Sequence, residues 1–208
     1  MTNKNVFDRE ELQHAMDYKT YLDMTFEEIK NADPDSLTME DKATLETKKL
    51  NMHRMSRIDK GYVPGADIEK EISDIDEKQT WMIITENWCG DSAQNLPYLA
   101  KIASLSRNID FKIILRDSNP KIMDIYLTNG ARSIPKLVVF DEEGKEVFQW
   151  GARPKAAQQL INELKAQGLE KKEFMEKLHF WYAKNKGADI EREILNLLKN
   201  SKLIKNSI

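Results

Sequence analysis

The sequence predicts an α/β fold, with a central mixed sheet flanked by helices and a helical extension at each end. Between residues 80 and 150, short apolar stretches alternate with helix-like segments in the order β-α-β-α-β-β. The flanking regions are charged and carry apolar residues at helical spacing. We therefore expect an N-terminal helical extension at 1–72, a core at 73–167, and a C-terminal helical extension at 168–208 that packs on the core.

The composition excludes several classes of protein. The 208 residues have a formal net charge of -3, so no basic excess favours nucleic acid and no polybasic tail favours a membrane. The N-terminus lacks the apolar stretch of a signal peptide, and no apolar run is long enough to span a bilayer. We expect a cytoplasmic protein with no nucleic-acid or membrane partner. The single cysteine excludes an intramolecular disulfide and a zinc site built from several cysteines.

The sequence pattern of the N-terminal region predicts three helices. Proline in Asp33-Pro34-Asp35-Ser36 interrupts the first, because proline disfavours helix at the residue before it. Thr38 and Asp41 have the spacing of a capping box and restart a helix that is expected to reach about Asp59. Gly61 and a turn at 63–66 end that helix. One further short helix is expected at 67–77.

The core is expected to contain four strands and two helices. In chain order they are a strand at 81–85, a helix at 92–106, a strand at 111–115, a helix at 120–129 ended by Asn129-Gly130, a strand at 136–140, a turn at 141–144 and a strand at 145–150. Helices between the first three strands predict parallel crossover pairing, and the tight turn predicts an antiparallel hairpin. After Pro154, two glycines divide the C-terminal region into about three helices.

The strongest chemical signal is Cys89 in the segment Trp88-Cys89-Gly90-Asp91-Ser92, directly after a strand and at the start of a helix. Unpaired N–H groups and the helix dipole favour a thiolate there, so the thiol pKa is expected to fall. A buried structural cysteine is the alternative. The strand–cysteine–helix setting favours the chemical interpretation.

These residues resemble the thioredoxin superfamily. Trp88-Cys89-Gly90 matches the start of its active-site motif, and Pro97 is similar to the proline that kinks its active-site helix. About 45 residues downstream, the segment 132–140 resembles the one that holds the family's cis-proline, and 141–144 and Gly151 also match. The resemblance covers roughly residues 75–167 and implies a thioredoxin-like fold.

By this resemblance Pro135 should be cis and lie beside Cys89. A cis bond leaves the backbone of Ile134 open to pair with a substrate strand, and Trp88 would shape the surface that receives it. The alternative is a trans proline that starts a buried strand.

The sequence departs from the thioredoxin pattern at three positions. Ser92 stands where a dithiol thioredoxin has its second cysteine, so an external thiol must resolve any mixed disulfide. The Ser92 hydroxyl can still donate to the thiolate or cap the helix. Asp91 occupies the usual proline position, and its carboxylate opposes ionisation of the thiol. Ile83 replaces a buried acid that many thioredoxins carry.

Basic residues recur on the second predicted helix. Arg54 and Arg57 are three apart and therefore lie near each other on its surface. This is either a solvated basic face or a cover for the active-site edge. In the second case the arginines would stabilise the thiolate or bind an anionic partner such as a carboxylate-bearing low-molecular-weight thiol. The three histidines have no ligand spacing, so no metal is expected. Arg153 is expected to belong to a structural joint between the last strand and a helix, and contact with an anion is the alternative.

The leading hypothesis is monothiol thiol–disulfide exchange with a protein or low-molecular-weight disulfide, without a cofactor. The expected catalytic residues are Cys89, Ser92 and Pro135, and the expected substrate-binding residues are Trp88, Gly90, Asp91, Ile134, Arg54 and Arg57. A non-catalytic binding or redox-sensing module is the competing hypothesis. The run Cys89-Gly90-Asp91-Ser92 is also similar to the monothiol glutaredoxin motif, which implies iron–sulfur binding between two subunits as a further alternative.

Overall fold

A computed structural model describes residue 12 and residues 14–205 of the chain. The first part of the predicted N-terminal extension therefore lies outside the described residues. In chain order the elements are α1 (Tyr18–Asn31), α2 (Met39–Gly61), α3 (Ala66–Ser73), β1 (Gln79–Thr85), α4 (Gly90–Ala103), β2 (Ile109–Leu115), α5 (Pro120–Ile125), β3 (Lys136–Phe140), β4 (Glu146–Gly151), α6 (Lys155–Ala166), α7 (Lys171–Asn185) and α8 (Ala188–Lys205). Within the described residues, no helix is both long and apolar enough to cross a membrane.

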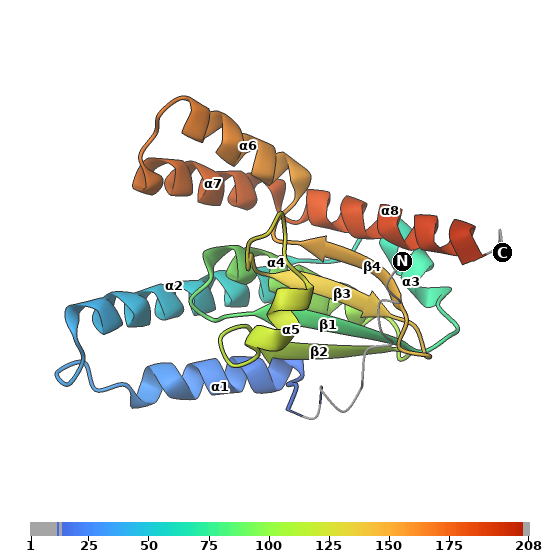
Figure 1. Ribbon diagram of the computed structural model, residues 1–208, viewed down its shortest axis with the longest axis horizontal. Coiled ribbons are helices and arrows are strands. Elements are labelled where there is room, and N and C mark those ends of the chain that lie inside the picture. Colours follow the sequence, from blue (N-terminus) through green and yellow to red (C-terminus); the bar gives the residue numbers. More distant parts are fainter. Residues whose placement is uncertain (1–11, 13, 206–208) are drawn as a thin grey trace.

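The four strands form one mixed sheet in the order β2-β1-β3-β4, which confirms the predicted fold class (Figure 1). β1 pairs with β2 in parallel, and β3 is antiparallel to both β1 and β4. The expected parallel pairing of β3 was therefore wrong. The cause is the short α5, whose 6 residues span roughly 9 Å, against roughly 23 Å for the 7-residue β1. The chain does not travel back along the sheet, so β3 starts at the edge where β1 and β2 end.

The connection from α5 to β3 contains a tight turn that the sequence analysis assigned to the end of a helix. The helix ends at Ile125, and Thr128 and Ala131 exchange backbone hydrogen bonds of 2.9 and 3.0 Å. Asn129 and Gly130 between them have φ values of 51° and 77°, as a type I′ turn requires. The turn directs residues 131–135 toward the end of β1.

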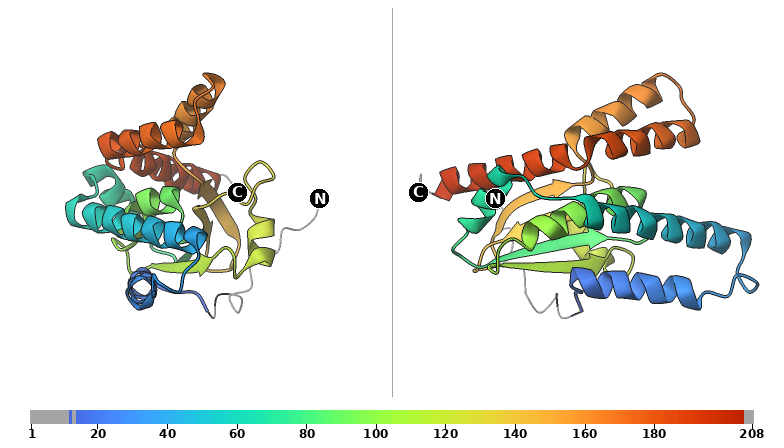
Figure 2. Two further views of the ribbon diagram at one scale, coloured as in Figure 1. Left: turned by 90° about the vertical axis from the view of Figure 1, so that its left-hand side faces the viewer. Right: turned by 180° about the vertical axis from the view of Figure 1, so that it is seen from behind.

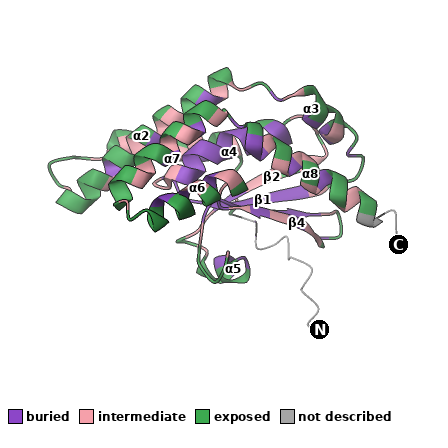
Figure 3. Ribbon diagram, turned by 90° about the horizontal axis from the view of Figure 1, so that it is seen from above, coloured by how far each residue is buried: buried purple, intermediate pink, exposed green. Residues whose placement is uncertain are grey.

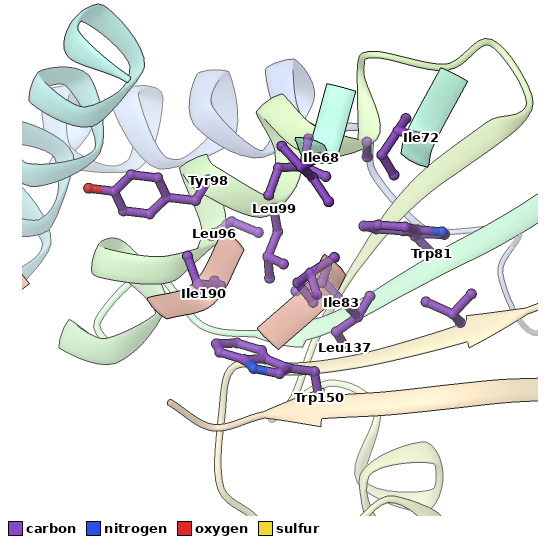
Figure 4. Close-up of a cluster of buried hydrophobic side chains, with 14 of the residues drawn as sticks. Ile68, Ile72, Trp81, Ile83, Leu96, Tyr98, Leu99, Leu137, Trp150 and Ile190 are labelled. Carbon is purple, nitrogen blue, oxygen red and sulfur yellow. The ribbon is translucent and has the colours of Figure 1, made fainter. Parts of the chain in front are cut away.

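The helices cover the two faces of the sheet unequally. α5 lies on one face, whereas α2, α3, α4 and α8 lie on the other (Figures 1 and 2). The larger hydrophobic cluster fills the space between α4 and the sheet, where Leu96 and Leu99 meet Ile83 (Figure 4). Both extensions contribute to it, through Ile68 of α3 and Ile190 of α8 among others. Burial is accordingly concentrated along α4 and β1 (Figure 3).

α6 and α7 form a helical hairpin that projects beyond the sheet (Figure 1). They pack together through a separate small cluster that includes Leu178 and Tyr182. Both are buried members of an aromatic and apolar stripe at helical spacing on α7. The end of β4 leads directly into this hairpin, so the hairpin stands beside the start of α4, where Cys89 lies.

Gly151, the last residue of β4, lies against the peptide that precedes β3. It pairs with Lys136 and has a φ of 127°. A Cβ atom added here would lie 2.2 Å from the carbonyl oxygen of Pro135. Only glycine therefore allows this close approach of two backbone segments. The peptide bonds Ile134–Pro135 and Gly151–Ala152 are both cis.

We predict that Gly151→Ala lowers the free energy of unfolding by about 2 kcal/mol or more, because it combines an unfavourable φ with a backbone clash. Urea denaturation measures the loss. Gly130→Ala is the matched control: Gly130 also has a positive φ, but an added Cβ meets nothing within 4 Å. It should cost only about 1 kcal/mol. Equal losses in the two variants would show that the contact with Pro135 contributes nothing.

Candidate active site

The loop after β1 places Cys89 at the N-cap of α4, beside the proline segment. Cys89 is partly exposed, and its Sγ donates a hydrogen bond to the carbonyl oxygen of Ile134 over 3.5 Å. The next peptide bond, Ile134–Pro135, is cis. Two motifs that lie 45 positions apart thus meet at the sulfur.

The surroundings of the sulfur favour the thiol over the thiolate. Burial raises the pKa of Cys89, and the charge of Asp91 raises it further. The Ser92 hydroxyl and the backbone N–H groups of Asp91 and Ser92 oppose this rise without overcoming it. The expectation of a lowered pKa was therefore wrong. Apolar packing around the sulfur removes more hydration than the helix N-terminus replaces.

Ser92 occupies the position of the missing second cysteine, one turn into α4. Its Oγ is buried and has no hydrogen-bond partner of ordinary geometry in the described part of the chain. A hydroxyl in this condition is available to a thiolate, and its proximity acts to lower the pKa of Cys89. Ser92 is thus placed to stabilise negative charge when Cys89 ionises.

Asp91 joins three separate elements of the fold. Its carboxylate accepts hydrogen bonds from the guanidinium of Arg153, one of them from Nε at 3.1 Å, and from the Tyr182 hydroxyl at 2.8 Å. The Tyr182 oxygen in turn accepts a bond of 3.1 Å from Asn95 of α4. Asp91 is only 6% exposed. Its carboxylate therefore anchors α7 and the start of α6 to the active-site helix.

The two arginines of α2 lie in different places. Arg54 donates a hydrogen bond of 2.9 Å to Asn51 and lies over Gly90, where an added Cβ would be 3.6 Å from Nη1. Arg57 is exposed and lines another hollow, with Tyr62 and Tyr98. Three residues advance a helix by about 4.5 Å and 300°, which moves Arg57 away from the site. Arg54 reaches the predicted position at the active-site edge, and Arg57 does not.

The N-terminal helices also hold the loop that carries the cysteine. The side-chain amide of Asn87 donates a hydrogen bond of 2.7 Å to Glu28 of α1, and the backbone carbonyl of Asn87 accepts one of 2.9 Å from the side-chain amide of Asn51 of α2. Asn87 precedes Cys89 by two positions. Both extensions therefore contact the active-site loop directly, one on each side of the cysteine.

A hollow of about 450 Å³ opens beside the sulfur. Of the predicted site residues, Trp88, Cys89, Asp91 and Ile134 line it, and four basic side chains join them. These are Arg116, Arg132, Arg153 and Lys155. The sequence analysis did not select any of them as functional. Their positions in the sequence could have indicated this hollow: one follows β2, one precedes Pro135 and two follow β4. All three connections lie at the end of the sheet where β1 leads to Cys89.

Comparison with known proteins places the chain in a family. A family model described as thioredoxin matches residues 38–165, which is more than half of the chain. The chain belongs to the thioredoxin family. The match begins at α2, so it includes part of the N-terminal region as well as the sheet. The predicted thioredoxin resemblance is confirmed.

Two solved structures share the thioredoxin-like fold over most of this chain. A protein of unknown function from Pseudomonas aeruginosa has a TM-score of 0.59 at 14% identity, with 91% of this chain and 95% of that chain covered. An HIV epitope-scaffold has a TM-score of 0.55 at 16% identity, with 92% and 96% covered. No curated protein matches the sequence. At these identities the likeness concerns the fold alone.

No group of three or more His, Cys, Asp or Glu that could hold a metal ion occurs among the described residues. The iron–sulfur alternative requires a second copy of the chain, so it stays a prediction.

We predict that Asp91→Asn lowers the pKa of Cys89, because it removes a nearby negative charge and leaves the charge of Arg153 unpaired in the hollow that Cys89 lines. Each unit of lowering raises the thiolate fraction about tenfold, so alkylation by neutral iodoacetamide at pH 7.5 should become several-fold faster. Asp110→Asn, at the far end of β2, is the matched control and should keep the wild-type rate. An unchanged or slower rate in Asp91→Asn would contradict the assignment.

His179 gives a second pH-dependent prediction. Burial, together with the charge of Arg54, lowers its pKa to about 4, against the opposing effect of Asp91. The folded protein therefore binds fewer protons at this site than the unfolded chain, and stability falls as the pH drops below about 6.5. The loss continues toward pH 4, at up to roughly 1.4 kcal/mol per pH unit.

Urea denaturation at several pH values should show a shallower acid limb for His179→Gln than for the wild type. His53→Gln, on the exposed surface of α2, is the control. Identical acid limbs for His179→Gln and the wild type would show that His179 is not held neutral by the fold.

Proposed function

We propose that the protein carries out monothiol thiol–disulfide exchange at Cys89. The observation that supports this is the position of the sulfur: it lies on the wall of an open hollow beside a cis-proline, not inside a closed core. The chain contains no second cysteine that could resolve the product. Regeneration of Cys89 by an external thiol requires a supply of reduced thiols, which a reducing compartment provides, so we propose that the protein acts in the cytoplasm.

The proposed reaction has two exchange steps. The Cys89 thiolate attacks one sulfur of a disulfide, a new bond forms to Cys89, and the original S–S bond breaks. The second sulfur leaves as a thiolate and takes up the proton that Cys89 released. An external thiol then attacks the mixed disulfide, and Cys89 returns to its thiol form. The net change is the exchange of one thiol for another in a disulfide.

The residues around Cys89 have separate roles in this scheme. The Ser92 hydroxyl stabilises the thiolate as it forms, and the Ile134 carbonyl holds the resting thiol proton. Pro135 fixes the backbone of Ile134 beside the sulfur. Trp88 forms part of the wall that receives the substrate.

The raised pKa of Cys89 gives the reaction a particular character. Little thiolate is present at neutral pH, so attack is slow. A thiol of high pKa is also a poor leaving group, so the mixed disulfide at Cys89 is long-lived. The site is suited to capture and retention of a thiol group more than to rapid turnover.

The raised pKa of Cys89 also supports a second candidate, a redox-sensing or binding module on the thioredoxin fold. In that case Asp91 and its partners serve only to stabilise the loop, and the mixed disulfide itself is the signal. The two candidates differ in whether an external thiol releases Cys89 repeatedly.

We predict that incubation with a low-molecular-weight disulfide adds one thiol group to the wild type and none to Cys89→Ser. Intact-mass spectrometry measures this addition. Because the thiolate reacts, the rate should rise about tenfold per pH unit below the thiol pKa. Ser92→Ala should be slower at neutral pH, because it removes the hydroxyl that favours the thiolate.

Addition of excess external thiol should then regenerate free Cys89 over repeated cycles if the protein is an exchange catalyst. A single addition that external thiol does not reverse supports the redox-sensing candidate instead. Absence of any adduct at pH 9 would overturn both the exchange proposal and the sensing one.

A further inference from the structure

The hollow beside Cys89 has a charge opposite to that of the whole chain. Four cationic side chains and one carboxylate line it, which gives the lining a formal charge of +3. The carboxylates of Asp117 and Asp124, which pair with Arg116 and Arg132, reduce the charge of the whole group to +1, whereas the protein carries -3. Cys89 and Arg153 line the same hollow, so these cations surround the space that a substrate of Cys89 would enter. A small anion that enters the hollow therefore meets a local positive potential beside the reactive atom.

The four cations are not equally available. Arg153 is held by the buried Asp91, and its Nη1 donates to Gln158 over 3.0 Å. Arg116 lies over the Trp88 ring, with its guanidinium carbon 4.7 Å from the ring centroid, and pairs with Asp117. These contacts fix the inner part of the hollow and orient its wall.

The outer two cations remain open to a ligand. Arg132 binds Asp124 through Nε and Nη2, both at 2.7 Å, which leaves its Nη1 without a partner within the described part of the chain. Lys155 is exposed, and its ammonium group has no hydrogen bond or ion pair to any described residue. The two side chains come from different segments, the loop before Pro135 and the start of α6.

We propose that this hollow is a subsite for the carboxylate groups of a low-molecular-weight disulfide, with Arg132 and Lys155 as the residues that select for charge. This proposal rests on thiol–disulfide exchange at Cys89 and names its substrate class. Guanidinium and ammonium groups are the usual partners of carboxylates in proteins. The volume of about 450 Å³ falls within the range of roughly 300–1,000 Å³ that is typical of small-molecule sites.

The arrangement also suits the chemistry of exchange. Attack by Cys89 releases the second half of the substrate as a thiolate, so negative charge increases in the hollow as the S–S bond breaks. The cations stabilise that charge, and they retain the carboxylate of the half that stays bound to Cys89. Asp91 contributes a negative charge to the same hollow, and its ion pair with Arg153 leaves the other three cations to act on the substrate.

The test compares disulfides of similar size and different charge on the full-length protein. Dithiodipropionate carries two carboxylates, hydroxyethyl disulfide is neutral, and cystamine carries two ammonium groups. The wild type should react fastest with dithiodipropionate once each rate is corrected for the intrinsic reactivity of the disulfide toward a free thiol. That preference should decrease as salt is added.

The variant Arg132→Gln/Lys155→Gln should lose the preference. Removal of two surface cations that lie close to the bound carboxylate should lower the rate constant for dithiodipropionate, relative to that for hydroxyethyl disulfide, by about tenfold. Lys145→Gln, an exposed lysine in the turn between β3 and β4 at the opposite end of the sheet, is the matched control and should keep the wild-type ratio. Circular dichroism verifies that each variant is folded.

The outcomes separate the two proposals. Equal corrected rates for all three disulfides in the wild type would overturn the carboxylate subsite and leave the exchange function intact. No reaction with any disulfide would overturn the exchange function, and the subsite would then be judged by binding alone.

Binding is measured on Cys89→Ser with suberate, a dicarboxylate in which methylene groups replace the two sulfurs of dithiodipropionate. Calorimetry should detect binding that the Arg132→Gln/Lys155→Gln changes weaken by about tenfold. Absence of binding, or binding that these changes do not weaken, would overturn the subsite.

Discussion

The contact between the buried carboxylate of Asp91 and its two partners determines how the rest of the site is built. A buried charge is costly unless it is paired and fully hydrogen-bonded, so Asp91 requires both Arg153 and Tyr182 in place. Arg153 fixes the end of β4, and Tyr182 fixes α7. Because Asp91 is the second residue of α4, these constraints reach Cys89 through two peptide units. The C-terminal region is therefore part of the active-site construction.

The protonation state of the sulfur results from a competition that burial wins. The helix N-terminus, two backbone N–H groups and the Ser92 hydroxyl all favour a thiolate. Apolar neighbours and Asp91 favour the thiol, and the Ile134 carbonyl accepts a hydrogen bond from it. A dithiol enzyme needs a good leaving group for rapid turnover. In the proposed monothiol exchange the mixed disulfide must persist until an external thiol arrives, and a sulfur of raised pKa, which is a poor leaving group, would meet that need.

The sequence was sufficient for the features that depend on local pattern. The strand at 136–140 has the predicted bounds, Thr38 caps α2 as its spacing indicated, and the thioredoxin motifs led to the correct family. Features that depend on tertiary placement were not accessible. The direction of β3 depends on how little distance α5 covers. The pKa of Cys89 depends on packing by segments far away in the chain, and the basic hollow combines side chains from three connections that no short motif unites.

In the proposed exchange, the residues that would recognise the charge of the substrate and the residues that set the pKa of Cys89 form two layers of one site. The inner layer contains the neutral thiol, Asp91 and Arg153, whose charges cancel. The outer layer contains Lys155, which has no ion pair to any described residue, and Arg132, which is paired with Asp124 but keeps its Nη1 open to a ligand. In the proposed exchange, cations in the outer layer would attract an anionic substrate while burial keeps the pKa of the resting thiol raised. In this proposal Arg132 and Lys155 would bind the carboxylate of the substrate. The same two cations would stabilise the thiolate that leaves when the S–S bond breaks. On this proposal a thiol of raised pKa could still select its substrate, because the residues that recognise charge are not the residues that set the pKa of Cys89.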